Sequence, residues 1–231
     1  MKRRYVTALA AAALIAGWTA FGDNDNAAPL VSATPADPAV SDNVDALLSE
    51  VFVVDELPDV AGYDRGCGID KQTRTPEGCV FGPAWSDPLS SSSCDTRNRL
   101  LRTQLHDITT KGGTRGCKIT GGYLDPDPYT GVRTELDHID ADHVVPLRRA
   151  WDAGAWQWTR RQRQIFATDL TELIAVDSSA NRSKSDSGLD EWLPSYQPCA
   201  YVMRYLTVAV KYRLLITAAE RDIAAATCQT Q

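Results

Sequence analysis

The sequence predicts an α+β fold, mainly helical and held together by disulfides. Residues 170–176 carry the aliphatic and β-branched side chains typical of a strand, whereas residues 199–215 place apolar side chains at helical spacing. Six cysteines occur in a chain that opens like an exported protein. After the N-terminal region about 190 residues remain, which suits one domain with its own hydrophobic core.

The N-terminus indicates export. Residues 1–4 are basic at three of four positions, and residues 5–20 contain no charged side chain. A basic tip before a short apolar stretch favours a secretory signal over a transmembrane span, which needs roughly 20 apolar residues. We expect residues 1–28 to be a signal peptide cleaved somewhere within 20–28, with an uncleaved membrane anchor as the alternative. Residues 29–43, rich in Ala, Pro and Asp, are expected to form a solvated tether.

The charge balance argues against general attraction to nucleic acid. The chain has 24 Lys and Arg residues against 30 Asp and Glu, a net charge of −6, and loss of residues 1–28 would leave −7. An acidic protein is not drawn as a whole to phosphate backbones. Any phosphate binding must therefore depend on a local basic patch or on a metal ion. The mature protein is expected to be secreted, with no stable membrane association after signal cleavage.

The six cysteines are predicted to form three disulfides. An even number of cysteines in an exported chain favours bridges, although about 15 connectivities exist for six cysteines. Zinc binding is the alternative, but the chain has no C-x-x-C pair and no cysteine within 20 residues of His143. We favour sequential pairing because each bridge would then close one local unit: Cys67–Cys79, Cys94–Cys117 and Cys199–Cys228.

Capping residues and turns predict the remaining elements. Asp95 can cap the helix that follows it, with Leu100, Leu101 and Leu105 as the buried stripe. Thr217–Glu220 has the spacing of a capping box and would open the last helix. Further expectations are irregular structure at 62–93, a strand at 117–124, an extended stretch at 132–145, helices at 148–153 and 155–167, and a helix carrying Asn181 that is capped by Ser178 or Ser179.

Two polar stretches carry the candidate chemistry. Residues 140–147 place two carboxylates and an imidazole within four positions, and residues 179–184 add an amide, a guanidinium and an ammonium. Carboxylate oxygens suit Mg²⁺, with Mn²⁺ as the alternative, and these ions keep positions open for water and phosphate. A histidine with an ordinary pKa of about 6.5 can take a proton from water near neutral pH. The pattern predicts a metal site facing a phosphate, with a base beside it.

The local geometry sets a condition on this prediction. Adjacent residues of a regular strand point to opposite faces, so Asp142 and His143 would not face one ligand within a strand. They can do so if the strand ends and the chain turns at this point. Pro146 favours such an end because proline has no N–H to donate to a central strand pairing.

These stretches resemble a known family. Asp-His-Val-Val-Pro at 142–146, the strand at 170–176 and Asn-Arg-Ser-Lys at 181–184 resemble the HNH endonucleases, whose core is a β-hairpin plus a helix around one metal ion, the ββα-metal or His-Me finger. The nearest resemblance is to the branch named for the C-terminal domain of the GmrSD restriction endonuclease, especially its small secreted bacterial members. The likeness covers roughly 47–228. It includes Gly78–Trp85, Cys94–Asn98, Asp127–Gly131, Glu191–Pro194 and Cys199–Val202.

The resemblance implies a ββα-metal (HNH) core within a nuclease domain at 44–231, and a role for each matching residue. His143 would be the general base and Asp142 the principal metal ligand. Asn181 matches the third position of the HNH motif, in the variant where Asn replaces the final His. It would act as a catalytic or metal-binding residue. Asp140 matches a second acidic position found upstream in some relatives.

Basic residues near these motifs are expected to bind the substrate. Arg182 and Lys184 occupy positions suited to phosphate contacts, and Arg148 follows the histidine motif. Binding would depend on a local cluster, so salt should weaken it. The expected cluster comprises Arg148, Arg149, Arg160, Arg161, Arg182 and Lys184.

One departure from the family pattern concerns the middle position of the motif. Glu172 stands where an Asn is expected at the entry to the second strand, and Thr168 stands where an Asn is expected before Asp169. In the family this residue orients the loop that carries the base. An ionised Glu172 can accept the same hydrogen bond but cannot donate one as an amide would.

Several other residues have less specific interpretations. His138 follows an aspartate but lacks a proline at the right distance, so we do not expect it to be the base. His106 is expected in a helix, and the Asn181–Ser183 sequon is discounted because a glycan would block the site. Arg97 is expected to pair with Asp95 beside its helix cap, or else to support the site. Core packing rather than base stacking is expected for Trp151, Trp156, Trp158 and Trp192.

Together these features predict a secreted, metal-dependent HNH endonuclease that hydrolyses phosphodiester bonds of DNA, with RNA as a further candidate substrate. Little sequence preference is expected because the sequence contains no helix-turn-helix, zinc finger or other reading module. The main alternative is an exported, non-catalytic binding or scaffold domain with the same fold, which the substitution at Glu172 would favour. A third is a metal-dependent hydrolase of another phosphate ester.

Overall fold

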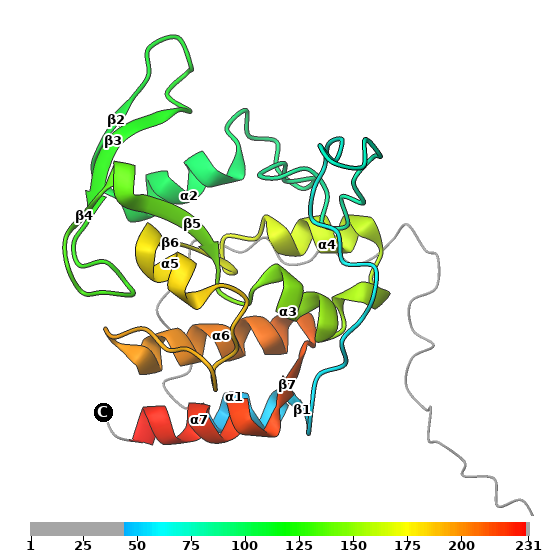
Figure 1. Ribbon diagram of the computed structural model, residues 1–231. Helices are drawn as coiled ribbons and strands as arrows, with labels where there is room; N and C mark the ends of the chain where they lie inside the picture. Colours follow the sequence, from blue (N-terminus) through cyan, green and yellow to red (C-terminus); the bar gives the residue numbers. More distant parts are fainter. Residues whose placement is uncertain (1–43, 230–231) are drawn as a thin grey trace, which may run out of the picture. The chain divides into compact units, whose positions relative to one another are not determined.

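The computed structural model describes residues 44–229, which form a small mixed α/β domain with three separate small sheets. Figure 1 shows the elements of this domain in chain order. The expected signal peptide at 1–28 and tether at 29–43 lie outside the described residues. The mixed α/β class and the disulfide links agree with the expectation from sequence.

The first and last elements of the described chain pack together as one mainly helical layer (Figure 1). Phe52 pairs with Leu215 in a parallel two-stranded sheet that joins the two ends of the described chain. Helix α6 ends at Tyr212 because Arg213 adopts a left-handed conformation, with φ of 53°. The elements of this layer are α1 (Val44–Glu50), β1 (Phe52–Val54), α6 (Pro198–Tyr212), β7 (Leu215–Thr217) and α7 (Ala218–Gln229).

The capping box predicted for the last helix is present. The backbone N–H of Thr217 donates to Glu220 Oε2 at 2.8 Å, and the N–H of Glu220 donates to Thr217 Oγ1 at 3.1 Å. Two backbone donors that the helix leaves unpaired are thereby satisfied, so α7 begins at Ala218.

A strand–strand–helix unit occupies the middle of the domain. Strands β5 (Ile139–His143) and β6 (Leu173–Asp177) pair antiparallel with Ala141 opposite Ala175, and α5 (Ser178–Lys184) follows β6 directly. Both faces of β6 are buried, because alternate side chains enter two separate hydrophobic clusters. This central position gives the unit a rigid base on which side chains can be held.

Helices join the two strands of this unit. They are α3 (Leu147–Asp152), the 3-10 turn η2 (Ala155–Gln157) and α4 (Arg160–Ala167). The single helix expected at 155–167 is wrong, because Thr159 interrupts it and starts α4 with a capping box that includes Gln162. Trp156 in the interruption is 45% exposed, whereas Trp151, Trp158 and Trp192 pack in or against the core as expected.

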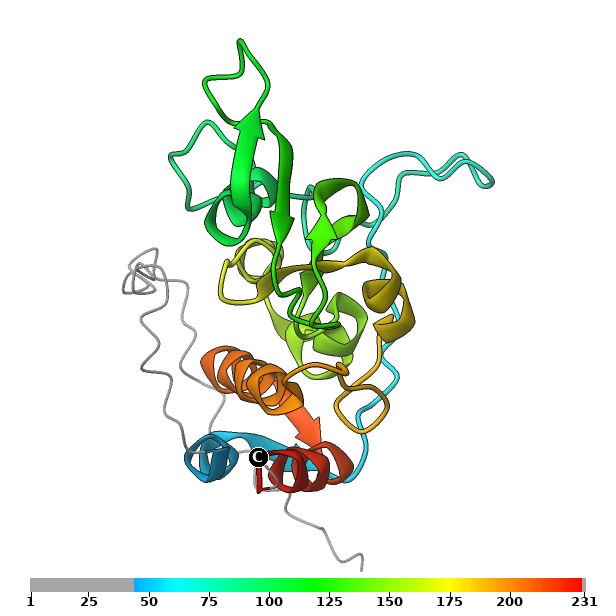
Figure 2. The same cartoon turned by 90° about the vertical axis from the view of Figure 1, so that its left-hand side faces the viewer.

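A hairpin projects from the rest of the domain in both views (Figures 1 and 2). It follows α2 (Thr96–Gln104), which has the predicted cap at Asp95. Its strands are β2 (His106–Thr110) and β3 (Ile119–Leu124), and β3 also pairs with β4 (Thr134–Glu135), which precedes the 3-10 turn η1 (Leu136–His138). The expectation that His106 lies in a helix is wrong, because α2 ends before Leu105 and His106 opens β2.

The predicted disulfide pairing is confirmed at all three bridges, Cys67–Cys79, Cys94–Cys117 and Cys199–Cys228. Each closes a local unit: an irregular segment, the end of the hairpin against the start of α2, and the helix pair α6–α7. No cysteine in the sequence is left over, so the zinc alternative is wrong for these residues. Within residues 44–229, the helices are all too short or too polar to span a bilayer.

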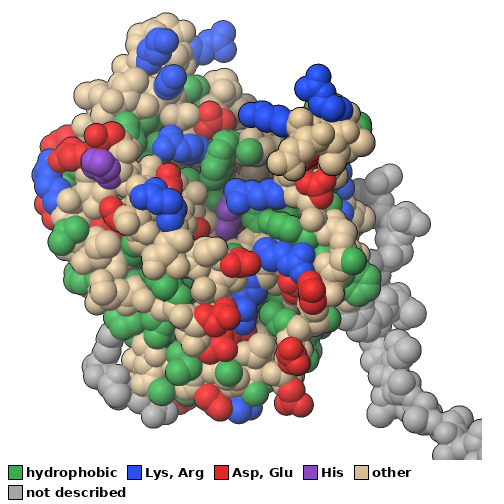
Figure 3. All heavy atoms as spheres, viewed as in Figure 1, with side chains coloured by type: hydrophobic (Ala, Val, Ile, Leu, Met, Phe, Trp, Pro, Cys, Tyr) green, Lys and Arg blue, Asp and Glu red, His purple; other side chains and the backbone are tan. Residues whose placement is uncertain are grey.

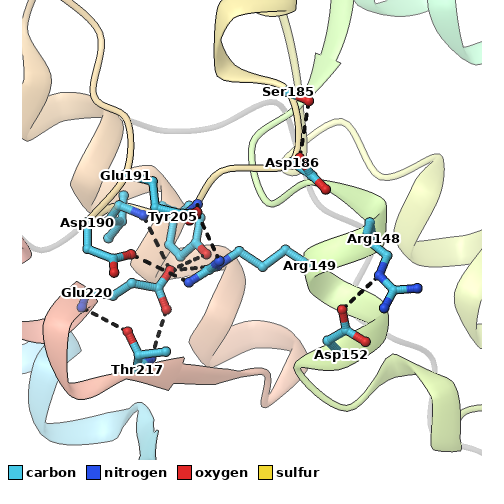
Figure 4. A network of polar contacts seen from close by, with 12 residues as sticks. Arg148, Arg149, Asp152, Ser185, Asp186, Asp190, Glu191, Tyr205, Thr217 and Glu220 are labelled. Carbon is cyan, nitrogen blue, oxygen red and sulfur yellow. Dashed lines mark hydrogen bonds and ion pairs between the residues drawn. The ribbon is translucent and has the colours of Figure 1, made fainter. Parts of the chain in front are cut away.

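A buried ion-pair network links α3 to the terminal layer (Figure 4). Arg149 Nε donates to Glu220 Oε1 at 2.9 Å, and the Tyr205 hydroxyl donates to the same oxygen at 2.7 Å. Glu220 is fully buried, and Arg149 also faces the carboxylates of Asp190 and Glu191. Arg149 was expected in a substrate-binding cluster, but its guanidinium instead joins two layers of the fold.

Candidate active site

A cleft of about 340 Å³ opens where β5 ends. Asp142 and His143 both line it, although they are neighbours on the strand. Strand β5 stops at His143, and the chain then turns through Pro146 into α3, so the cleft extends around the end of the strand. The structure therefore meets the geometric condition that the sequence set. In Figure 3, Lys and Arg side chains surround a histidine near the centre of the viewed face.

Helix α5 faces the two carboxylates of β5. Asn181 and Lys184 are three residues apart and so lie on one side of the helix. Asn181 Nδ2 lies 3.4 Å from Asp140 Oδ2, and Lys184 Nζ lies 2.9 Å from Asp142 Oδ2. The fold thus brings Asp140, Asp142 and Asn181 close to one another, and their role as metal ligands stays a prediction. Asn181 lines the cleft with Asp142, whereas Asp140 contacts Asn181 but does not line the cleft.

The start of α5 differs from the expectation. Ser178 and Ser179 were predicted as caps, but the carboxylate of Asp177 accepts hydrogen bonds from the N–H groups of Ser179 and Ala180, each at 2.9 Å. The helix follows β6 without a linker, so the last strand residue is in the capping position. This direct junction sets Asn181 one turn into the helix and opposite β5.

Lys184 has a different environment from the one predicted. Its side chain is fully buried, and its ammonium contacts Asp142 at 2.9 Å and donates to the carbonyl of His143 at 2.8 Å. A buried ammonium with two protein partners does not reach a substrate phosphate. The expected phosphate contact of Lys184 is therefore corrected to a contact that positions Asp142 and the end of β5.

Tyr129 is a site residue that sequence reasoning did not single out. Its buried hydroxyl donates to Asp142 Oδ2 at 2.7 Å. Burial, then the nearby Asp142 carboxylate, raises the pKa of Tyr129 well above its ordinary value, so the hydroxyl remains a donor. The 127–131 stretch was noted only for its family resemblance, and the tyrosine within it gave no separate signal.

The loop that carries Tyr129 is fixed by a buried carboxylate. Asp127 Oδ1 accepts from the N–H of Tyr129 at 2.9 Å, and Asp127 Oδ2 accepts from the N–H of Asp177 at 2.6 Å. Asp127 is fully buried and joins this loop to the start of α5. The same contact therefore positions Tyr129 and the helix that holds Asn181 and Lys184.

His143 is held in one tautomer by a backbone contact. Its Nε2 lies 3.0 Å from the carbonyl oxygen of Ala167. A carbonyl only accepts, so Nε2 must carry the proton, and the lone pair of the neutral ring is on Nδ1. The ring stacks on Trp85, with centroids 6.2 Å apart and planes inclined by 11°. Burial lowers the pKa of His143 to about 3, so the imidazole is neutral at neutral pH but is a weaker base than an exposed imidazole.

Glu172 supports the chain just after His143. Its two carboxyl oxygens lie 3.2 and 3.3 Å from the backbone nitrogen of Val145, and its own carbonyl accepts from the N–H of Val144 at 2.8 Å. The side chain thus accepts a hydrogen bond from the loop, as expected. The sequence argument considered an ionised Glu172, whereas burial raises the pKa of Glu172 well above its ordinary value, which favours the neutral acid.

The predicted basic cluster does not form as expected. Arg148 lines the cleft but contacts the carboxylates of Asp59 and Asp152, the latter at 2.9 Å. Arg182 is exposed on α5, outside the cleft wall, and Arg161 is exposed on α4. The guanidinium of Arg160 donates to the sulfur of Cys79. Arg149 and Lys184 are engaged in the interior.

Arg65 is a cleft residue that the sequence did not indicate. It is exposed, and within residues 44–229 its guanidinium makes no ion pair or hydrogen bond. It lines the main cleft and also a second cavity of about 120 Å³, which shares His143 and Leu147 with the first. A free guanidinium beside His143 suits a phosphate. Arg65 lies in the segment predicted to be irregular, where no periodicity could mark it.

The donors in the cleft fit a hard cation. Asp142 and Asn181 offer oxygen atoms, and Asp140 accepts from the amide nitrogen of Asn181, which leaves the amide oxygen for another partner. Mg²⁺ takes oxygen ligands and is commonly held by one or two carboxylates plus water. Among the residues that the structure describes, no three His, Cys, Asp or Glu side chains are grouped to hold a metal. The candidate set combines carboxylate with amide oxygen.

Fold and site together define a small disulfide-linked α/β domain in which a strand–strand–helix unit presents a neutral histidine, a carboxylate and an amide to one cleft. A sequence profile of the C-terminal domain of GmrSD restriction endonucleases matches residues 95–225, more than half of the chain. The chain belongs to this family, which indicates a nuclease-like function. The matched range contains β5, β6 and α5 but begins after Arg65.

One curated relative of this chain is described as secreted. The chain is 39% identical over 137 residues to a protein described as an uncharacterized secreted protein from Arthroderma benhamiae (strain ATCC MYA-4681 / CBS 112371). The alignment covers 57% of this chain and 65% of that relative, just under two thirds of its length. The three disulfides are consistent with an extracellular environment as well. No solved structure matches the chain.

Proposed function

We propose that this protein is a secreted endonuclease that hydrolyses phosphodiester bonds of DNA, with a divalent cation and little sequence preference. The observation that carries the proposal is the setting of His143. Its Nε2 proton is engaged by the Ala167 carbonyl, and its neutral ring lines an open cleft beside Asp142. An imidazole that is oriented by its Nε2 contact and lies next to an oxygen-rich donor set suits hydrolysis of a phosphate ester.

His143 would take the proton from the attacking water on Nδ1. The water oxygen bonds to phosphorus, the bond from phosphorus to the ester oxygen breaks, and the departing oxygen takes a proton from solvent. A divalent cation, Mg²⁺ or Mn²⁺, held by Asp142 and Asn181 would offset negative charge on the phosphate and on the departing oxygen. The contact with Ala167 keeps the histidine ring oriented throughout, and Glu172 holds the loop that follows it.

Cationic side chains of the cleft would hold the substrate phosphates. Arg65 has no carboxylate partner among residues 44–229, whereas Arg148 shares its charge with Asp59 and Asp152. We therefore assign the stronger phosphate contact to Arg65. The protein is acidic, with a net charge of −6, so such local contacts must supply the attraction to nucleic acid.

Nicking of a supercoiled plasmid tests the proposal. The purified chain with intact disulfides is expected to convert supercoiled DNA to nicked and linear forms with Mg²⁺ or Mn²⁺, and EDTA should abolish this. Absence of cleavage of both DNA and RNA with either ion would overturn the nuclease assignment. A small phosphodiester that is hydrolysed and is not displaced by DNA would instead support a hydrolase of other phosphate esters.

One observation favours the non-catalytic alternative. Asp142 is already satisfied by an ion pair with Lys184 and by the Tyr129 hydroxyl, so it does not require a cation. In that case the protein would be an exported binding domain that keeps the fold. Titration with Mn²⁺ separates the two proposals, because equal affinity of the wild type and Asp142→Asn would favour the binding domain.

Replacing Lys184 with methionine should make the fold depend on metal. The variant leaves Asp142 buried without its cationic partner, which typically costs about 3–5 kcal/mol of unfolding free energy. Because the competing ammonium is gone, Mn²⁺ should bind more tightly than to the wild type and restore much of the lost stability. Thermal unfolding with and without Mn²⁺ measures both effects.

Lys211→Met is the matched control for this variant. Lys211 forms an ion pair with Asp169 at 2.7 Å, away from the cleft, and its side chain is 34% exposed. Its loss should lower the melting temperature slightly and equally with or without Mn²⁺. If Mn²⁺ fails to stabilise Lys184→Met more than it stabilises Lys211→Met, Asp142 is not a metal ligand.

A further inference from the structure

The β2–β3 hairpin ends in a concentration of positive charge. We call residues 106–124 the basic hairpin. From 108 to 124 it contains no Asp or Glu, and Lys111, Arg115 and Lys118 are all exposed at or near its end. The chain as a whole has a net charge of −6, so this stretch departs from the acidic character of the protein.

The basic hairpin is held in place by several contacts at its end. Cys117 is bridged to Cys94, just before α2. The N–H of Ile119 donates to Asn98 Oδ1 at 2.9 Å, and the guanidinium of Arg102 donates to the carbonyl of Gly116. The end of the hairpin is thus joined to α2, so its charges are presented with little loss of conformational entropy on binding.

The three charges of the hairpin end have no partners in the protein. Within the described residues, the side chains of Lys111, Arg115 and Lys118 make no ion pair and no hydrogen bond. By contrast, Arg133 near the hairpin base contacts Glu135 at 2.9 Å, and Arg148 in the cleft has two carboxylate neighbours. Three unpaired cations on a held, projecting element suit a polyanionic partner.

We propose that the basic hairpin is a second nucleic-acid contact, which binds the phosphate backbone of a duplex at a distance from the phosphate held in the cleft. This inference rests on the proposed function. In the view of Figure 3, basic side chains lie both around the central hollow and where Figure 1 places the hairpin end. One duplex lying across this face would meet both regions.

The length of β3 sets how far the hairpin end reaches beyond the base of this strand. Five steps of about 3.3 Å from Leu124 to Ile119 carry the chain roughly 17 Å away from the base of β3. Phosphates of one DNA strand are spaced by about 3.4 Å along the axis, so this corresponds to about five base pairs. The contact involves backbone phosphates, which carry no sequence information, and so agrees with cleavage of low sequence preference.

The test compares two sets of three charge-neutralising substitutions. Lys111→Gln, Arg115→Gln and Lys118→Gln remove the charges of the hairpin end. The control, Arg161→Gln, Arg213→Gln and Arg221→Gln, removes as many exposed basic residues from α4 and the terminal layer. Arg115 and Arg213 both have positive φ, at 56° and 53°, so each set replaces one residue with a left-handed backbone conformation.

Binding is measured in EDTA, without cleavage, on a duplex of about 30 base pairs. The short control ligand is a dinucleotide, whose phosphodiester can occupy the cleft but which cannot also reach the hairpin end. The hairpin variant should bind the long duplex roughly 10- to 100-fold more weakly, and the slope of log affinity against log salt should fall by about 2–3. Its affinity for the dinucleotide, and the affinity of the control variant for both ligands, should stay at the wild-type level.

Equal affinities of the two variants for the long duplex would overturn the inference. So would hairpin-dependent binding to vesicles of anionic lipid at the same salt with none to the duplex, which would assign the hairpin to a membrane surface. Plasmid cleavage by the wild type separates the two proposals. If the wild type does not cut while the hairpin variant still loses affinity for the duplex, the nuclease proposal fails and the hairpin contact stands.

Discussion

Replacing His143 with alanine is expected to slow DNA cleavage by roughly 100- to 10,000-fold, the range typical for loss of a general base. The substitution removes the nitrogen that would accept the proton of water, while Asp142, Asn181 and Arg65 remain in the cleft. The initial rate of plasmid nicking measures the loss. Far-ultraviolet circular dichroism should show that the domain still folds.

His138→Ala is the matched control for this prediction. His138 also follows an aspartate, but its side chain is 71% exposed and contacts Asp137 at 3.8 Å. Its removal should leave the nicking rate unchanged. Added imidazole should partly restore the activity of His143→Ala, because the alanine leaves space beside Trp85 where the ring stood. Wild-type nicking by His143→Ala would show that another group is the base.

Replacing Glu220 with alanine is expected to cost about 3–5 kcal/mol of unfolding free energy, as is typical when one partner of a buried ion pair is removed. The fully buried carboxylate accepts from Arg149, from Tyr205 and from the backbone of Thr217 (Figure 4). Its loss leaves the Arg149 guanidinium, with a side chain only 13% exposed, without its nearest counter-charge. Chemical denaturation with the disulfides intact measures the change.

Asp222→Ala provides the comparison within the same helix. Asp222 pairs with Arg221 at 2.7 Å on the surface, with side chains 68% and 46% exposed, so its removal should change stability little. If Glu220→Ala unfolds at the same denaturant concentration as Asp222→Ala, the buried network does not contribute to stability. Helix α3 follows the cleft residue Pro146, so Glu220→Ala should also reduce activity at temperatures near its unfolding transition.

Local signals predicted several elements well. Asp95 caps α2, Thr217 and Glu220 form the capping box of α7, and the cysteines pair sequentially as expected. These features depend on residues close in sequence, and short-range contacts restrict the chain in much the same way in any fold. The paired strands β1 and β7 could not be predicted in this way, because Phe52 and Leu215 meet only after the whole domain has folded.

The candidate site shows the same difference between features set by nearby residues and features set by distant contacts. The motif at 140–147 and its partner Asn181 could be named from sequence, because the residue types and their order carry the chemistry. The environments of individual cationic side chains could not be predicted from sequence. Arg65 comes from a segment with no regular pattern, and Arg149 was expected to face substrate although it pairs with a carboxylate 71 positions away.

The sequence by itself determined the mixed α/β class, the three disulfides and the identity of the histidine and carboxylate at the end of β5. Only the tertiary structure decided what Lys184 and Tyr129 do, since both converge on one oxygen of Asp142. The physical reason is desolvation. A charged side chain in water is free to meet a ligand, whereas the same side chain in the interior must take a protein partner, and burial depends on distant segments.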